Sequence, residues 1–216
     1  MSRQMADPAF HADQTARAFT APHIAPLNAF VDSIRDRDGR GWVPYVPPHH
    51  GGIDARVISI LRDPGPATQL GTGSGFISLE NDDPTAERMA HLFDRYGIAS
   101  RVVLPWNAYP WYINAAPNAA QSKAGALVLL ELLELTPEID VVLLQGRDAE
   151  KAWRRAVAFD PLLDRPFSVY ATIHPGRQAL FHPDAVERQR RVAHQERTFE
   201  MIAGHLATND DDTFQA

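Results

Sequence analysis

The chain contains no cysteine, which removes several classes of chemistry at once. Disulfide frameworks, thiolate metal sites, iron–sulfur clusters and a cysteine nucleophile are all excluded. The sequence also lacks an apolar run close to the roughly 20 residues that cross a bilayer. Its first ten residues lack the charged-then-apolar pattern of a signal peptide. We therefore expect a cytoplasmic protein without a membrane partner, whose chemistry uses carboxylates, histidine, asparagine, hydroxyls or backbone groups.

Positive charge is scarce: 21 Lys and Arg stand against 27 Asp and Glu, for a net charge of −6 at pH 7. Because Lys and Arg neutralise phosphate, this balance argues against general nucleic-acid binding. It still allows a local basic surface on an acidic body, since part of the acidity lies in the run Asp210 to Asp212. A length of 216 residues predicts one domain with terminal extensions.

Four short apolar runs rich in β-branched residues predict strands, at residues 56–61, 101–104, 140–144 and 168–173. Each run is apolar on both faces, as expected of strands that are covered on both sides. Helical patterns lie between the runs. The sequence therefore predicts an α/β fold, a three-layer α/β/α domain with a central, mostly parallel, four-stranded sheet.

The helical patterns also indicate the domain boundaries. We expect residues 1–40 to form a helical cap packed on the domain, residues 41–206 to form the α/β domain, and residues 207–216 to be a disordered acidic tail. One helix inside the domain has a clear start signal, with Asp83 as its N-cap and Pro84 at its first position.

The chemically distinctive residues gather in three loops that each follow a predicted strand. In parallel sheets, ligands bind beyond the carboxyl ends of the strands, so these loops are expected to meet at one site. The loops read Arg62-Asp63-Pro64-Gly65-Pro66, Pro105-Trp106-Asn107-Ala108-Tyr109 and His174-Pro175-Gly176-Arg177-Gln178.

Each loop contains a residue suited to a chemical role. Asp63 can polarise water or stabilise a positive charge, and His174 can donate a hydrogen bond to an oxygen that gains charge. Asn107 offers a donor and an acceptor that can read a nucleobase edge, with its aromatic neighbours as pocket walls. Arg177 can bind phosphate. Structural roles remain open: Asp63 as a turn residue, His174 as a structural histidine, Asn107 bonded to its own loop, and the aromatic rings as core.

Two further patterns point to metals or cofactors only superficially. His49 and His50 are adjacent, and neighbouring residues rarely ligate one ion, so we predict no metal. Gly71, Gly73 and Gly75 resemble a dinucleotide fingerprint, but they neither follow a strand directly nor open a helix. We therefore expect no cofactor.

Taken in order, the three loops resemble the uracil-DNA glycosylase superfamily over roughly residues 44–190. Asp63-Pro64-Gly65 is similar to the Asp-Pro or Asn-Pro-Gly motif of that family, and the run that starts at His174 is similar to its His-Pro-Ser motif. Phe76 follows Asp63 by 13 positions, which matches the spacing of the family's base-stacking Phe. Asn107 lies where the family reads the uracil edge.

The resemblance implies a monofunctional DNA N-glycosylase of base excision repair. Such a hydrolase cleaves the bond between a damaged base and its sugar and leaves an abasic site, without metal or cofactor. Its partner would be uracil-containing or mismatched DNA, and the protein would act as a monomer. The implied site residues are Asp63 and His174 for catalysis, Phe76, Asn107, Gly65 and Asn81 for base binding, and Pro47, Pro48, Arg177, Gln178 and Leu180 for DNA contact.

The sequence departs from the family pattern at two positions. Gly65 stands where the strict uracil branch has a bulky Tyr, so the resemblance implies a specificity broader than uracil. Gly176 replaces Ser, which removes a hydroxyl that contacts phosphate in the family. Two other functions stay open: a nucleoside or nucleotide N-glycosidase that acts on a free small molecule, and a non-catalytic binder of damaged or single-stranded DNA.

Overall fold

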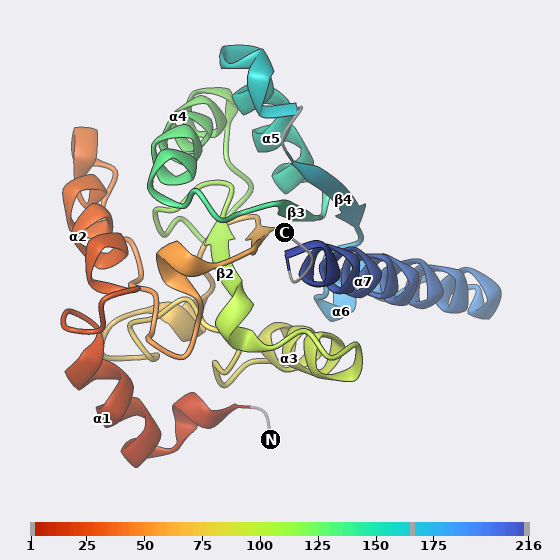
Figure 1. Ribbon diagram of the computed structural model, residues 1–216, viewed down its shortest axis with the longest axis horizontal. Helices are drawn as coiled ribbons and strands as arrows, with labels where there is room; N and C mark the ends of the chain where they lie inside the picture. The colour runs from red at the N-terminus through yellow and green to blue at the C-terminus, as the bar shows by residue number, and fades with distance from the viewer. Residues whose placement is uncertain (1–2, 165–166, 214–216) are drawn as a thin grey trace.

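The computed structural model describes residues 3–164 and 167–213. It has a parallel sheet with helices on both faces (Figure 1), and each neighbouring pair of strands is parallel. The predicted three-layer α/β/α fold with a four-stranded sheet is therefore confirmed. The sheet has the order β2-β1-β3-β4 and consists of β1 (Val57–Leu61), β2 (Val103–Asn107), β3 (Val141–Gln145) and β4 (Ser168–Thr172).

Two hydrophobic cores lie on the two faces of the sheet. Ile58 and Ile60 of β1 enter a core shared with α2, α4 and α5, whereas Val57 enters a core shared with α3 and α7. Alternate strand residues point to opposite faces, so burial of both faces requires runs that are apolar throughout. The helices are α1 (Pro8–Arg17), α2 (Ala25–Ile34), α3 (Pro84–Arg95), α4 (Ala119–Leu135), α5 (Arg147–Phe159), α6 (Arg177–Leu180) and α7 (Ala185–Thr213).

Helix α3 begins as the sequence predicts. The Asp83 carboxylate accepts hydrogen bonds from the backbone N–H groups of Thr85 (2.8 Å) and Ala86 (3.0 Å), and Pro84 occupies the first helical position. A capped helix start satisfies backbone donors that would otherwise have no partner. This cap orients the first turn of α3 toward the carboxyl edge of the sheet, where the candidate site lies.

The two terminal segments differ from a simple cap and tail. The expected N-terminal helical segment is present, and its α2 is part of the main core, where Leu27, Val31 and Ile34 are fully buried. At the other end, α7 continues to Thr213, and the part of it that reaches away from the sheet in Figure 1 is its lighter-blue N-terminal portion. The expectation of a disordered tail from residue 207 is wrong through residue 213, because a helix anchored by packing adds further residues at little cost. Residues 214–216 lie outside the described part of the chain.

In the described ranges, no helix has both the length and the apolar character that a membrane crossing requires.

The adjacent histidines His49 and His50 are buried next to each other, and each is hydrogen-bonded to other residues. The ring centroids of His49 and His50 are 4.0 Å apart. His49 Nδ1 lies 3.2 Å from Gln14 Oε1 and its Nε2 lies 3.1 Å from Ser78 Oγ. His50 Nε2 accepts a hydrogen bond from the Leu79 backbone N–H at 3.2 Å. Burial lowers the pKa of His49 to about 4 and the pKa of His50 well below 6.5.

We expect this pair to make the fold sensitive to acid. A folded-state pKa below the unfolded value means that the unfolded chain binds more protons at low pH. The stabilisation is therefore complete above about pH 6.5 and is lost as the pH falls toward 4, by about 3 kcal/mol for His49. We expect the free energy of unfolding, measured with urea, to fall less between pH 7 and pH 4.5 in His49→Gln than in the wild type. His91→Gln, on the exposed side of α3, is the control, and equal losses in all three proteins would contradict the expectation.

Candidate active site at the carboxyl edge of the sheet

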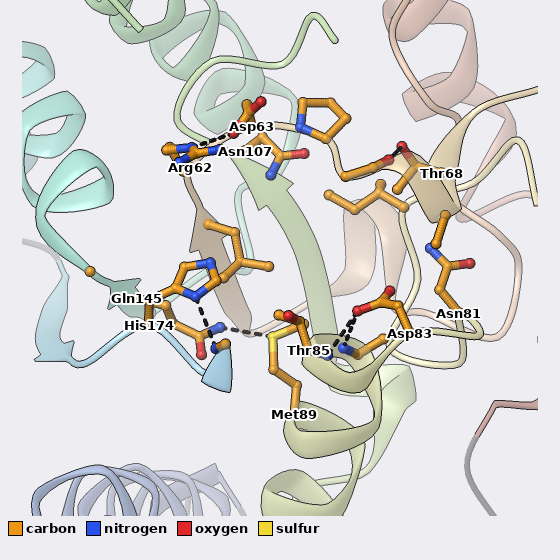
Figure 2. Close-up of a pocket in the computed structure, with 18 of the residues that line it drawn as sticks. Arg62, Asp63, Thr68, Asn81, Asp83, Thr85, Met89, Asn107, Gln145 and His174 are labelled. Atoms are coloured by element: carbon orange, nitrogen blue, oxygen red, sulfur yellow. Dashed lines mark hydrogen bonds and ion pairs between the residues drawn. The ribbon is translucent and has the colours of Figure 1, made fainter. Parts of the chain in front are cut away.

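A cavity of about 770 Å³ lies where the parallel strands end (Figure 2). The first three strands reach it through Leu61, Asn107 and Gln145, and His174 follows β4 by two residues. In the sheet, β2 lies on one side of β1, and β3 and β4 lie on its other side. The connection that leaves β1 leads to β2, and the connection that leaves β3 leads to β4. The loops after β1 and β3 therefore separate, and this is the point at which open α/β sheets bind ligands.

The cavity collects most of the residues expected at the site. Asp63, Asn107 and His174, from three separate strand ends, line it together. Figure 2 draws Asp63, Asn107, His174 and Gln145 among the residues that line the cavity. Of the other expected residues, Gly65, Asn81, Arg177 and Gln178 line the cavity, whereas Phe76, Pro47, Pro48 and Leu180 do not.

Asp63 is a buried carboxylate that is held through both oxygens. Its side chain is 3% exposed, Oδ1 is ion-paired with Arg62 Nε, and Oδ2 accepts a hydrogen bond from the Ala115 backbone N–H at 3.3 Å. The contact with Ala115 comes from a distant part of the chain, so Asp63 does more than close its own turn. A fixed negative charge at this position can stabilise positive charge that develops in a bound ligand.

Asn107 is buried but keeps its amide available. It is 3% exposed, lines the cavity, and forms no side-chain hydrogen bond with any residue in the described ranges. Because this amide has no partner among the described residues, a ligand in the cavity can pair with its donor and its acceptor. Asn107 is the last residue of β2 rather than part of a loop, so the loop expected to start at Pro105 starts after Asn107.

The aromatic residues near Asn107 belong to the core and not to the cavity wall. Trp106, Tyr109 and Trp111 are at most 2% exposed and lie in the α2–α4–α5 core. Trp111 Nε1 donates a hydrogen bond to the backbone oxygen of Ile34 at 2.8 Å. The expected aromatic walls are therefore wrong. Adjacent strand residues face opposite sides, so the strand that directs Asn107 to the cavity directs Trp106 away from it.

Phe76 is likewise outside the cavity. Its ring is 4% exposed and packs in a small cluster with Met5 and Ala18. The backbone of Phe76 forms a parallel bridge with Tyr45, so the chain is extended there. Neighbouring side chains of an extended segment point in opposite directions, and Ile77 lines the cavity instead. The segment 13 residues after Asp63 reaches the cavity through Ile77, so the position of Phe76 does not fit the stacking role expected of it.

The His174 ring presents an N–H donor on Nε2. Its Nδ1 accepts a hydrogen bond from the Gly176 backbone N–H at 2.9 Å, so the proton of the neutral ring is on Nε2. Burial lowers the pKa of His174 below 6.5, the charge of Arg62 lowers it further, and Asp63 acts in the opposite direction. The ring is therefore neutral at pH 7. A Cβ at position 176 would lie 2.9 Å from Nδ1, so a side chain there would displace the ring.

Two prolines expected to press on DNA are not on the surface. Pro47 and Pro48 are buried, and their backbone oxygens accept hydrogen bonds from His50 N (3.1 Å) and His23 Nε2 (2.9 Å). The expectation of DNA contact through these two residues is wrong, because the N-terminal helical segment covers this loop.

Two of the other three residues expected to contact DNA line the cavity. Arg177 and Gln178 are exposed on α6 and line the rim. Leu180 is half-buried at the end of the same short helix. Their contact with DNA stays a prediction.

Two residues expected to bind the base have different surroundings. Asn81 lines the cavity, but its Nδ2 donates to the Phe76 backbone oxygen (2.9 Å) and its Oδ1 accepts from Ser74 Oγ (2.7 Å). These bonds use the amide to hold the glycine-rich loop, so Asn81 supports the wall and is not free to read a base. Gly65 has an ordinary φ of −82°, and a Cβ built on it would meet nothing within 4 Å. Glycine at position 65 therefore leaves room in the cavity.

Gln145 is a site residue that the sequence reasoning missed. It is 1% exposed and its Nε2 donates to Ser59 Oγ at 2.7 Å and to Met89 Sδ at 3.1 Å, while Oε1 is buried without a partner in the described part of the chain. The signal was present: a polar residue ends the third apolar run, at the position in β3 that corresponds to Asn107 in β2.

No family model matches the chain, and a search of curated proteins finds no match.

Proposed function

We propose that the protein is a DNA N-glycosylase that releases uracil, or a related deaminated base, from DNA and leaves an abasic site. The observation that supports this most directly is the convergence of Asp63, Asn107 and His174 on one cavity. They supply a buried carboxylate, an amide without a partner among the described residues and a neutral imidazole whose Nε2–H has none there either. On this proposal the enzyme works as a cytoplasmic monomer in base excision repair.

Each group has a part in the proposed reaction. The target nucleotide leaves the duplex and its base enters the cavity, where Asn107 pairs with one edge of the base. The bond between C1′ and the base nitrogen breaks with its electron pair on the base, and His174 Nε2–H donates to the base oxygen that gains negative charge. One such donor is worth about 2.7–4 kcal/mol. Asp63 stabilises the cationic sugar and orients the water whose oxygen bonds to C1′.

The contact between the cavity and the faces of the base is aliphatic. No Phe, Tyr or Trp lines the cavity within the described ranges, and its apolar surface comes from non-aromatic residues such as Leu61, Pro64 and Ile77. An aromatic ring typically contributes about 1–3 kcal/mol per stacked base. We therefore expect base selection to depend on the hydrogen bonds of Asn107 and His174 more than on stacking.

An alkaline-cleavage assay tests the proposed function. The substrates are oligonucleotides with uracil opposite guanine, uracil in a single strand, a thymine mispair, hypoxanthine or xanthine, and we expect strand cleavage with uracil. Free deoxyuridine and its 5′-monophosphate are assayed in parallel, because the net charge of −6 favours a small-molecule substrate. Base release from these alone would indicate a nucleotide N-glycosidase. Binding of the oligonucleotides without any abasic product would indicate a non-catalytic binder.

Enlarging residue 65 should narrow the range of bases. We expect Gly65→Tyr to retain release of uracil and to reduce release of bulkier bases about tenfold or more, because the ring would occupy space that is open in the wild type. Gly65→Ala, which adds one methyl group, is the matched control and should have an intermediate effect. Single-turnover rates on the same set of oligonucleotides measure both variants. A uniform loss on every base would contradict the spatial role of Gly65.

Removing the Asn107 amide should weaken discrimination between bases. A side-chain contact of this type is worth about 1–3 kcal/mol of discrimination, so we expect Asn107→Ala to lower the preference for uracil over other bases about tenfold to a hundredfold. The ratio of single-turnover kcat/KM values for two bases measures the effect, and circular dichroism checks that the variant folds. An unchanged ratio would remove Asn107 from base reading.

A further inference from the structure

The acidic residues of the cavity are already engaged within the protein. Asp63 is ion-paired with Arg62. Asp83 caps α3, and Asp148 forms an ion pair with Lys151 at 3.3 Å. Each carboxylate that lines the cavity therefore has a partner, and its charge is at least partly compensated.

The arginines of the cavity are less fully engaged. Arg147 and Arg177 are exposed on the lining, and neither forms an ion pair or a side-chain hydrogen bond within the described part of the chain. The side chain of Arg62 is 40% exposed and contacts Asp63 through Nε alone. Its two terminal nitrogens donate to no described residue. The cavity thus offers guanidinium donors to an anion, although the whole chain is acidic.

We propose that Arg62 binds a phosphate group of the substrate through its terminal nitrogens while its Nε keeps its bond to Asp63. A guanidinium has five N–H donors in one rigid plane, so it can hold a carboxylate on one edge and a phosphate on another. This inference rests on the proposed function and deepens it. The substrate is a nucleotide with a phosphate beside the target sugar, either free or within a DNA strand.

This arrangement makes Arg62 a positioning residue for Asp63. The carboxylate is held between Arg62 Nε and the Ala115 N–H, so a phosphate that orders the Arg62 side chain also orders Asp63. A ligand without phosphate would bind to the same cavity with a less well fixed carboxylate. Phosphate binding is therefore expected to affect the rate of base release as well as affinity.

The ionisation of His174 supplies a second, independent measurement. The charge of Arg62 is the second cause, after burial, of the lowered pKa of His174. Replacing Arg62 with a neutral residue should raise that pKa, so the acid limb of the rate profile should move to higher pH. A residue that only stabilised the fold would not shift this limb.

Neutralising one phosphate at a time tests the proposal. Single-turnover rates and fluorescence-anisotropy affinities are measured for uracil oligonucleotides in which one phosphate flanking the uridine is replaced by an uncharged methylphosphonate. We expect one such replacement to lower the rate and the affinity of the wild type about tenfold to a hundredfold. The same replacement should lower those of Arg62→Gln much less. Arg62→Lys, which retains the charge, should restore part of the sensitivity to phosphate neutralisation. Arg101→Gln, an exposed arginine before the opposite end of β2, is the matched control and should behave as the wild type.

The outcomes separate this inference from the proposed function. Equal costs of phosphate neutralisation in the wild type and in Arg62→Gln, or no cost in the wild type, would overturn the role of Arg62. If the wild type releases no base at all, the proposed function fails, and the anisotropy comparison still decides whether Arg62 binds phosphate. Tight binding of deoxyuridine 5′-monophosphate relative to deoxyuridine would indicate a terminal phosphate, whereas a requirement for the oligonucleotide would indicate a phosphodiester.

Discussion

Replacing Asp63 with Asn is expected to slow base release by about 10²–10⁴-fold, the range observed when a positioned catalytic acid or base is lost. The substitution removes the negative charge that faces the developing sugar cation, while the side chain keeps its size and its oxygen for the Ala115 N–H. Oligonucleotide affinity should change by no more than about threefold, because the lost interaction is formed mainly in the transition state.

Two measurements decide this expectation. Single-turnover cleavage reports the reacting step, and fluorescence anisotropy at one salt concentration reports binding. Asp94→Asn, an exposed aspartate near the far end of α3, is the control for loss of one negative charge and should react at the wild-type rate. Equal losses of cleavage and binding in Asp63→Asn would show that Asp63 has a structural role only.

Replacing His174 with Ala is expected to reduce base release by about 10²–10³-fold, as for other preorganised donors to an oxygen that gains charge. Gly176→Ala is the informative companion. It retains the imidazole, but the added methyl group would lie 2.9 Å from Nδ1 and would displace the ring. We therefore expect an intermediate loss in Gly176→Ala, whereas His91→Ala, on the surface of α3, should be unaffected. Wild-type activity in both His174→Ala and Gly176→Ala would remove the imidazole from the mechanism.

The pH dependence of the rate follows from the same hydrogen bond. The pKa of His174 lies below 6.5, so the ring stays neutral as the pH falls from 8 to about 6.5. At lower pH a proton binds to Nδ1, and the hydrogen bond donated by the Gly176 N–H is lost. The contribution of the neutral ring to the rate of base release is thus complete above pH 6.5 and declines below it. Single-turnover rates measured from pH 8 to 5 should be constant and then fall, and a rise toward acid would contradict a neutral donor.

Local sequence signals were sufficient where local chemistry decides the structure. The Asp83–Pro84 cap set the start of α3, and the four apolar runs located all four strands. The predicted end of the second strand was wrong. The apolar run ends at residue 104, but β2 extends through Asn107, because a polar residue can be the last residue of a strand that is buried on both faces. Gln145 was missed for the same reason.

The spacing of residues along the sequence could not predict the direction in which a side chain points. Phe76 and Ile77 are adjacent apolar residues, and either could have faced a ligand. The bridge between Phe76 and Tyr45, whose partners lie far apart along the chain, decides which of the two points into the cavity. Pro47 and Pro48 are a similar case, since their burial depends on helices elsewhere in the sequence.

The amino-acid sequence by itself determined the parallel α/β fold and placed Asp63, Asn107 and His174 near the carboxyl ends of three strands. Hydrophobic periodicity and cap residues act over a few positions, so they can be read directly along the chain. Only the tertiary structure decided that Asp63 is buried and bonded to the Ala115 N–H, that the Asn107 amide has no partner in the described ranges, and that both residues line one cavity with His174. These properties come from contacts and burial between segments brought together by folding, and no local pattern encodes them.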